Sequence, residues 1–233
     1  MTELIDWIND RRIVLVSGKS AIPNAAEAIA GRAIEGSWWG DPQGSLIFRL
    51  LSELEDDAPH YLDVPLVEGK HTLVSPRLAP VVSALASDPE RRRRVVDTLK
   101  APARELFEVL ADGRTVRSDD GGHGGKVARS TRTALESGLL ARSTSVHTVS
   151  GHHAAVLEGY GQHPPEGAPP AGRLRELLET GLRSAVVAEK GGVEKWFRFV
   201  EPDRLRRSCA VSELGADEIH AAGRVWLTLS ASA

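Results

Sequence analysis

The amino-acid sequence predicts a mainly α-helical fold with small β-hairpins, of the α+β class, made of tandem winged-helix-like units. Apolar residues recur at helical spacing along much of the 233-residue chain. Two β-prone runs flank a glycine-containing turn between residues 61 and 74. Three helices followed by a strand are expected in both the middle and the last part of the chain, which favours repeated units of one architecture.

Changes in composition divide the chain into three predicted units. A linker begins near residue 87, and the proline- and glycine-rich residues 162–172 have little capacity to pack. We therefore expect an N-terminal helical unit with a β-hairpin at residues 1–88, a central winged-helix unit at residues 89–161 and a C-terminal winged-helix-like unit at residues 173–233. A hydrophobic content of 41% gives the chain enough apolar side chains for a core.

The first predicted unit combines helices with a hairpin. Asn24 is a candidate N-cap for the helix after it, and Gly36 ends that helix. We expect the adjacent Trp38 and Trp39 to wedge into the core at the entrance of the next helix. The expected elements are a strand or helix end at 13–16, helices at 25–34 and 46–54, strands at 61–67 and 71–74, and a helix at 78–86.

The central predicted unit holds a run of four arginines, residues 91–94, inside an expected helix at 90–99. The run has two interpretations, a solvated helix face or a patch that contacts phosphate. Residues 112–125 form a polar, glycine-rich connection. The other expected elements are helices at 103–110 and 126–138, a strand at 139–147, and a short helix that starts at residue 150 and carries His153.

The last predicted unit begins with an amphipathic helix at residues 174–188, which Gly191 and Gly192 end. Further helices are expected at 193–199 and 204–222, and a strand at 224–229.

The helix expected at 126–138 has an apolar face and a cationic face, with Glu136 on the exposed side. In a helix-turn-helix, the second helix enters the major groove and presents side chains to phosphates and base edges. The alternative is the ordinary solvated face of an amphipathic helix. The residues expected to pack are Val127, Thr131, Ala134 and Leu135. The predicted DNA-binding residues are Lys126, Arg129, Ser130, Arg132 and Thr133.

The candidates for acid–base chemistry in the central unit are Asp119, Asp120, His147 and His153. A carboxylate there would stabilise an oxocarbenium-like sugar while an N-glycosidic bond breaks. The histidines lack Cys, Asp or Glu partners at ligand spacing, so we expect no metal and no cofactor. The sequence contains no nucleophile elbow, no zinc-protease motif, no Walker loop and no dinucleotide-binding glycine pattern.

The charge distribution points to the central unit as the place for DNA. The net charge of −3 excludes a protein that is basic over its whole surface. Residues 89–160 carry 12 basic and 9 acidic side chains, whereas residues 1–88 carry 7 and 13. The single Cys209 is expected to be a buried thiol. With no long apolar run and an acidic amino terminus, the chain is expected to be cytoplasmic and to have no membrane partner.

Two pairs of strings carry a resemblance to a known family. The first pair is GSWWGDPQG at 36–44 and GKHTLV at 69–74, and the second is LESGLL at 135–140 and VHTVSGHH at 146–153. These strings resemble a group of bacterial winged-helix proteins related to the AlkZ-type DNA glycosylases, which release alkylated bases or unhook interstrand crosslinks. The resemblance covers residues 20–230 and implies tandem winged helices and an affinity for DNA.

The resemblance does not extend to the catalytic motif of those glycosylases. They position the attacking water with a Gln-aliphatic-Gln motif, whereas this sequence contains only Gln43 and Gln162, far apart. Catalysis by that mechanism is therefore not implied.

We expect a protein that binds double-stranded DNA through its central unit, with a role in DNA repair or in resistance to DNA damage. Two alternatives stay open. One is a divergent glycosylase that acts on alkylated or crosslinked bases with a different acid or base. The other is a protein-interaction module without DNA binding, because winged helices also dock partners and the first third of the chain is acidic.

Overall fold

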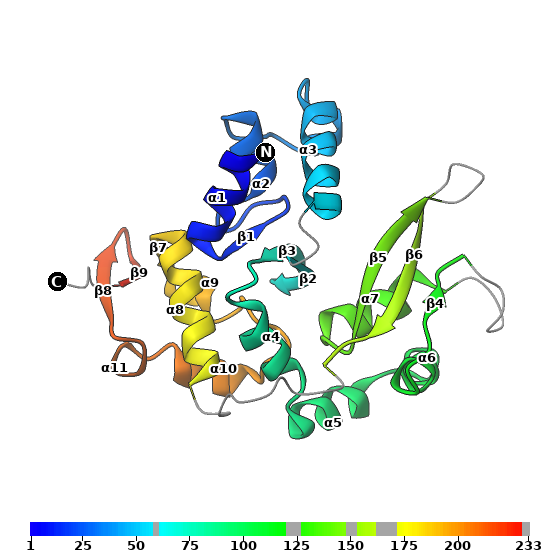
Figure 1. Ribbon diagram of the computed structural model, residues 1–233. Coiled ribbons are helices and arrows are strands. Elements are labelled where there is room, and N and C mark those ends of the chain that lie inside the picture. Colours follow the sequence, from blue (N-terminus) through cyan, green and yellow to red (C-terminus); the bar gives the residue numbers. More distant parts are fainter. Residues whose placement is uncertain (58–60, 120–126, 148–152, 162–171, 230–233) are drawn as a thin grey trace. The chain divides into compact units, whose positions relative to one another are not determined.

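Figure 1 shows the computed structural model, which describes residues 1–57, 61–119, 127–147, 153–161 and 172–229. These residues fold into helices and antiparallel sheets, so the predicted α+β class is confirmed. In this part of the chain the strands form three sheets of three strands each. The chain divides into two compact units, one made of residues 1–81 with 171–233 and the other of residues 82–170.

The first module, residues 2–74, passes from a helix and a strand to further helices and a hairpin. Its elements are α1 (Thr2–Arg11), β1 (Ile13–Leu15), α2 (Ala25–Ala30), the 3-10 helix η1 (Trp38–Gly40), α3 (Gly44–Asp57), β2 (Leu62–Val67) and β3 (Lys70–Val74). The strand order is β1-β3-β2, with Val14 opposite Leu73. As predicted, Asn24 caps α2, and its side chain accepts a hydrogen bond from the backbone N–H of Glu27 at 2.8 Å.

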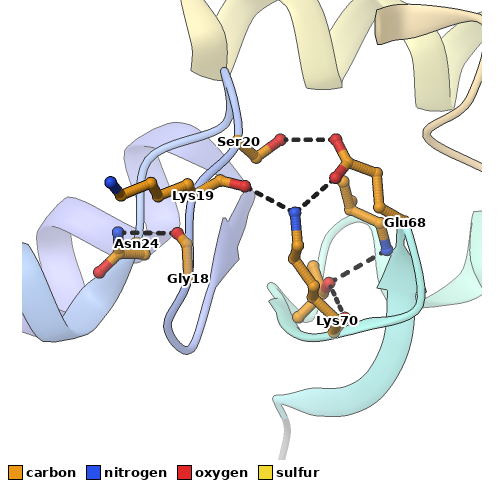
Figure 2. A network of polar contacts seen from close by, with 8 residues as sticks. Gly18, Lys19, Ser20, Asn24, Glu68 and Lys70 are labelled. Atoms are coloured by element: carbon orange, nitrogen blue, oxygen red, sulfur yellow. Dashed lines mark hydrogen bonds and ion pairs between the residues drawn. The ribbon is translucent and has the colours of Figure 1, made fainter. Parts of the chain in front are cut away.

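A two-residue turn, Glu68-Gly69, closes the predicted hairpin, and both residues have positive φ, 55° and 76°. This geometry is that of a type I′ turn, which glycine adopts without steric cost. Figure 2 shows how side chains hold the turn. Lys70 Nζ bonds the Glu68 carboxylate and, at 2.6 Å, the carbonyl oxygen of Lys19, while Ser20 Oγ donates to Glu68 at 3.2 Å. The loop after β1 is thereby fixed to the turn.

The last module, residues 173–229, repeats this order of elements. It contains α8 (Arg173–Ala185), β7 (Val187–Glu189), α9 (Lys190–Val193), α10 (Pro202–Ser208), α11 (Val211–Leu214), β8 (Ala216–Ala221) and β9 (Arg224–Leu229). The strand order is β7-β9-β8. The prediction of one helix over 204–222 is wrong because Gly215, with a φ of 61°, ends α11, and the chain continues as β8.

The first and last modules belong to one compact unit, whereas residues 1–88 and 173–233 were predicted as two separate units. Helix α8 contacts both β1 and α1, and Ser184 Oγ on α8 donates to the carbonyl oxygen of Ile13 at 2.7 Å. The backbone N–H of Glu68 donates to the carbonyl oxygen of Trp196 at 2.6 Å. Contacts between residues about 130 to 170 positions apart in the sequence therefore join the two modules. Helix α4 (Ala79–Ala86) follows the first module in the chain.

The central module, residues 101–159, has a shorter form of this order, with one helix between its first strand and its hairpin among the described residues. Its elements are α6 (Ala101–Ala111), β4 (Val116–Arg117), α7 (Arg129–Ser137), β5 (Ala141–His147) and β6 (His153–Gly159), with α5 (Pro89–Thr98) before them. The strand order is β4-β6-β5. Leu110 on α6 and Leu135 on α7 are buried in one core cluster with Leu157 of the sheet. The module thus buries one face of each helix against its own sheet.

His153 begins a strand, so the short helix predicted from residue 150 is wrong. β6 pairs with β5 from His153 opposite His147 to Gly159 opposite Ala141. Ala155 and Leu157, two residues apart, are buried in the core cluster, which is the period of a strand. A short apolar run is ambiguous between helix and strand, and the long pairing with β5 decides this one.

The arginine run of α5 is largely structural. Arg91 is only 4% exposed and donates to the carbonyl oxygens of Gly138 at 2.5 Å, Leu139 at 3.3 Å and Ala86 at 2.6 Å. Gly138 is the C-cap of α7, where a cation compensates the helix macrodipole. Burial lowers the pKa of Arg91 to about 10, which leaves it charged at neutral pH.

Arg92 and Arg94 of the run also have defined partners, whereas Arg93 is exposed. Arg92 donates to the carbonyl oxygens of Tyr160 at 2.7 Å and Gly161 at 2.9 Å, beyond the end of β6. Arg94 pairs with Glu90 at 2.9 Å. Neither a fully solvated face nor a continuous phosphate patch describes the run, because Arg91 and Arg92 hold the module together.

Candidate nucleic-acid interface

Helix α7 presents three of the five predicted DNA-binding residues to solvent. Arg129, Ser130 and Thr133 are exposed, and the helix begins at Arg129, three residues later than predicted. The backbone N–H of Val127 donates to the carbonyl oxygen of Ser118 at 3.1 Å, which fixes the start of α7 to the end of β4. Lys126, the fourth predicted residue, lies outside the described residues.

Arg132, the fifth predicted residue, pairs with an acid of its own helix. Its Nε lies 3.6 Å from Oε2 of Glu136, one turn later, and the other carboxylate oxygen of Glu136 accepts the hydroxyl of Ser143 on β5. Glu136 is only 5% exposed. A buried carboxylate is costly without a counter-charge, so Arg132 balances charge inside the module.

The helical projection misplaces two residues of α7. Ala134, expected to pack, is exposed, whereas Glu136, expected at the surface, is buried. The cause is the packing of α7 against both α6 and β5, which widens the buried stripe beyond Leu135. The partner that makes burial of Glu136 tolerable, Ser143, comes from a strand, so a single-helix projection does not reveal it.

Other arginines of the central module form ion pairs at its surface. They are Arg117 with Asp119 at 3.1 Å, Arg142 with Glu158 at 2.5 Å and Arg114 with Asp112 at 3.5 Å. Such exposed pairs add little stability, yet they remove free positive charge. Arg129 is exposed and has no acidic partner in the part of the chain that the structure describes. It is therefore the strongest candidate on α7 for an ionic contact with an external anion.

Three of the four acid–base candidates lie at one end of the central sheet. Asp119 follows β4, His153 begins β6, and His147 ends β5 opposite His153. The two Asp119 carboxylate oxygens accept hydrogen bonds from Arg117 Nε and Nη2, each at 3.1 Å. Asp120 and the side chains of both histidines lie outside the described part of the chain. An acid–base role for these residues stays a prediction.

The structure also bears on metal sites, membrane spans and the single cysteine. Within the described ranges, no group of three or more His, Cys, Asp or Glu residues could hold a metal ion. No helix among the same residues is long and apolar enough to cross a membrane. Cys209 is buried, as predicted, and burial raises its thiol pKa to about 12, so the thiol is inert at neutral pH.

An aromatic surface stack in the first module was not expected. Trp39 is 64% exposed, and its ring stacks on Trp38 with the centroids 4.1 Å apart and lies 5.4 Å from Phe48, itself 37% exposed. The prediction that both tryptophans enter the core is wrong for Trp39. Trp38 packs against the cluster around Ile47, but η1 turns too tightly for the next indole to follow it.

The candidate interface is thus the outer face of α7, formed by Arg129, Ser130 and Thr133. A serine or threonine hydroxyl and a free guanidinium are groups that contact phosphate or base edges in the major groove. No protein-family model, no curated protein and no solved structure matches this chain, so the interface is defined by its own geometry.

Proposed function

We propose that the protein binds double-stranded DNA through tandem winged-helix modules, with the outer face of α7 as a contact surface. The observation that carries the proposal is a repeated topology. The strand orders are β1-β3-β2, β4-β6-β5 and β7-β9-β8, so in each module the strand after the first helix pairs with the last strand of the hairpin. A winged helix has this order, and the helix before its hairpin is the one that enters the major groove.

The helices before the three hairpins differ in charge. α3 carries one arginine and four acidic residues, α7 carries two arginines and one glutamate, and α11, which lies directly before β8, carries one glutamate and no basic residue. DNA presents a dense row of negative phosphates, so cationic helices suit it and an acidic helix does not. The proposal therefore assigns DNA contact to α7 and leaves α3 outside it.

Arg129 is the residue on α7 whose position suits contact with DNA. It is the first residue of the helix, and residues near the N-terminus of a recognition helix reach the base edges. Ser130 and Thr133 lie beside it as hydroxyl donors for phosphate oxygens. A role in repair or in resistance to DNA damage belongs to the same proposal and is supported by the resemblance described above.

Fluorescence anisotropy with a labelled duplex of about 20 base pairs, two helical turns, tests the proposal at low salt. We expect Arg129→Ala to weaken binding by about 1–3 kcal/mol. The matched control is Lys100→Ala, which removes an exposed cation of the same compact unit that is not part of α7, and we expect it to leave the affinity unchanged. Absence of wild-type binding, or equal affinities for both variants, would contradict the proposal. Release of free base from an alkylated duplex would instead favour the glycosylase alternative.

A second candidate function, protein contact through the first module, is favoured by the exposed stack of Trp39 and Phe48. Large apolar side chains that gather at a surface mark interaction sites. α3, which carries Phe48, is acidic and does not suit DNA. Sedimentation velocity over a range of concentrations tests the candidate. A dimer that Trp39→Ala abolishes would support it, and a wild-type monomer at every concentration would count against self-association.

A further inference from the structure

The last module contains a cation-rimmed groove that sequence reasoning did not single out. Its volume is about 340 Å³, and it lies between the segment after α9 and the start of α10. The residues that matter for its chemistry are Lys195, Arg198 and Arg206 on the rim and Phe197, Val200 and Leu205 beneath them. The groove belongs to the compact unit that contains both the first and last modules.

Two of the rim cations, Lys195 and Arg198, lie outside the ion pairs that the structure describes. Lys195 and Arg198 are exposed, and no acidic side chain among the described residues pairs with either. Arg206 pairs with Asp203, and Glu194 also lines the groove. The rim therefore keeps a positive excess that an external anion would neutralise.

The floor of the groove is apolar and fixed. Phe197 and Leu205 are 0% and 1% exposed, and Phe197 packs against both Trp196 and Phe199. A rigid floor holds the flanking Lys195 and Arg198 backbones in place, which lowers the ordering cost of binding a ligand. The site is thus better defined than two lysine or arginine side chains on a mobile loop.

The hairpin turn of the first module braces one side of this segment. The backbone N–H of Glu68 donates to the carbonyl oxygen of Trp196, which lies between Lys195 and Arg198 in sequence. A Cβ on Gly69 would lie 3.6 Å from Nη1 of Arg198, so the turn also approaches that guanidinium. Figure 2 shows the contacts of Ser20 and Lys70 that hold Glu68 itself. The network thereby fixes the backbone from which the rim cations project.

We propose that this groove binds the phosphate backbone of nucleic acid and forms a second contact surface of the protein. The inference rests on the proposed function, which it deepens by naming a contact surface outside the central module. Phosphate contacts by Lys and Arg supply the sequence-independent part of DNA affinity. The neighbouring α10 also carries Arg207, exposed in its last turn next to Arg206 in sequence. An uncharged apolar ligand would leave Lys195 and Arg198 without partners, so the charge pattern favours a polyanion.

The test uses the full chain and the double variant Lys195→Glu/Arg198→Glu. Its matched control is Arg77→Glu/Arg183→Glu, which reverses two exposed cations of the same compact unit that do not line the groove. Thermal unfolding of both variants establishes that they fold. Affinity for a labelled duplex of about two helical turns is measured at low salt, together with that of Arg129→Glu.

We expect the groove variant to lose about tenfold or more in affinity and the control to lose less than about twofold. An unchanged affinity of the groove variant, while Arg129→Glu weakens binding, would overturn the groove and leave the proposed function standing. Weaker binding by the groove variant, together with unchanged binding by Arg129→Glu, would support the groove and remove the assignment of DNA contact to α7. A wild-type protein that binds polyglutamate but no DNA would overturn both proposals and indicate an acidic protein partner.

Discussion

In helix α7, Nε of Arg132 lies 3.6 Å from Oε2 of Glu136, a carboxylate that is almost completely buried. The two residues form an internal pair one helical turn apart, and Ser143 on the neighbouring strand bonds the same carboxylate. Arg129, one turn before Arg132, has no such partner among the described residues. The two arginines of this short helix therefore differ in role. Arg132 balances the charge of Glu136, whereas Arg129 is available to a ligand.

Replacement of Arg132 should affect stability, whereas replacement of Arg129 should not. Arg132→Ala removes the cation from a buried carboxylate, and we expect a loss of about 1–3 kcal/mol in the free energy of unfolding. Arg132→Lys keeps the positive charge and should therefore lower the free energy of unfolding by less than Arg132→Ala. Arg129→Ala, at an exposed position, should change stability by less than about 0.5 kcal/mol. Urea denaturation measures all three, and equal stabilities of the two alanine variants would contradict this division of roles.

Arg91 should be the most sensitive position of the arginine run. Arg91→Met keeps much of the side-chain volume but removes the donors to Gly138, Leu139 and Ala86, which leaves buried carbonyl oxygens without partners. We expect a loss of about 2–4 kcal/mol, because hydrogen bonds from a charged group and buried unsatisfied acceptors both contribute. Arg93→Met, at an exposed position of the same helix, is the control. Denaturation midpoints that do not differ between them would refute a structural role for Arg91.

Gly161 should resist substitution because of a close approach to another backbone. A Cβ at Gly161 would lie 2.8 Å from backbone atoms of Ala86. Gly113 has a φ of 79°, close to the 67° of Gly161, but a Cβ at Gly113 would meet no atom within 4 Å. A comparison of the two glycines therefore separates the effect of crowding from that of backbone strain. We expect Gly161→Ala to cost about 1–3 kcal/mol more than Gly113→Ala. Thermal denaturation of the two variants checks this, and identical shifts would show that the approach is not tight.

The buried thiol of Cys209 should make stability depend on pH in the alkaline range. Burial raises its pKa from 9.0 to about 12, so between these values the unfolded chain releases a proton that the folded chain retains. This contribution to stability is complete below pH 9 and is lost as pH rises toward 12. The free energy of unfolding of Cys209→Ala should therefore fall less between about pH 7.5 and pH 10 than that of the wild type. Parallel pH profiles from urea denaturation would contradict the assignment.

Local signals allowed much of the fold to be predicted. The hairpin at residues 62–74 follows from two β-prone runs around Glu68-Gly69, and Asn24 is an N-cap by residue type and position. Strand β9 (Arg224–Leu229) lies where it was expected, and the long helix α8 (Arg173–Ala185) begins where it was expected but ends three residues early, before strand β7 (Val187–Glu189). Each of these features depends on residues within one element or one turn.

Features that depend on distant partners could not be predicted in the same way. The burial of Glu136 requires Ser143, and the role of Arg91 requires carbonyl groups 47 and 48 residues away. Strand β6 (His153–Gly159) was mistaken for a helix because its identity depends on pairing with β5. A projection of α7 therefore identified exposed Arg129, Ser130 and Thr133 and buried Leu135, but misplaced Ala134, which is exposed, and Glu136, which is buried.

The groove of the last module also lacked a sequence signal. Lys195 and Arg198 flank Trp196 and Phe197 in a short connection, where two cations three residues apart attract no notice. Their significance depends on the burial of the intervening aromatic rings and on the contact between Trp196 and the Glu68 turn. The sequence predicted a helix over 193–199, whereas α9 ends at Val193 and these cationic and aromatic residues lie in the turns that follow it.

The salt dependence of duplex binding tests the central claim most directly. Each phosphate contact that a cation makes adds about 0.9 to the slope of log affinity against log salt concentration. If Arg129 contacts a phosphate, the slope for Arg129→Ala should be smaller than that of the wild type by about 1, while Lys100→Ala should keep the wild-type slope. Identical slopes and affinities for the wild type and Arg129→Ala would contradict DNA contact by α7.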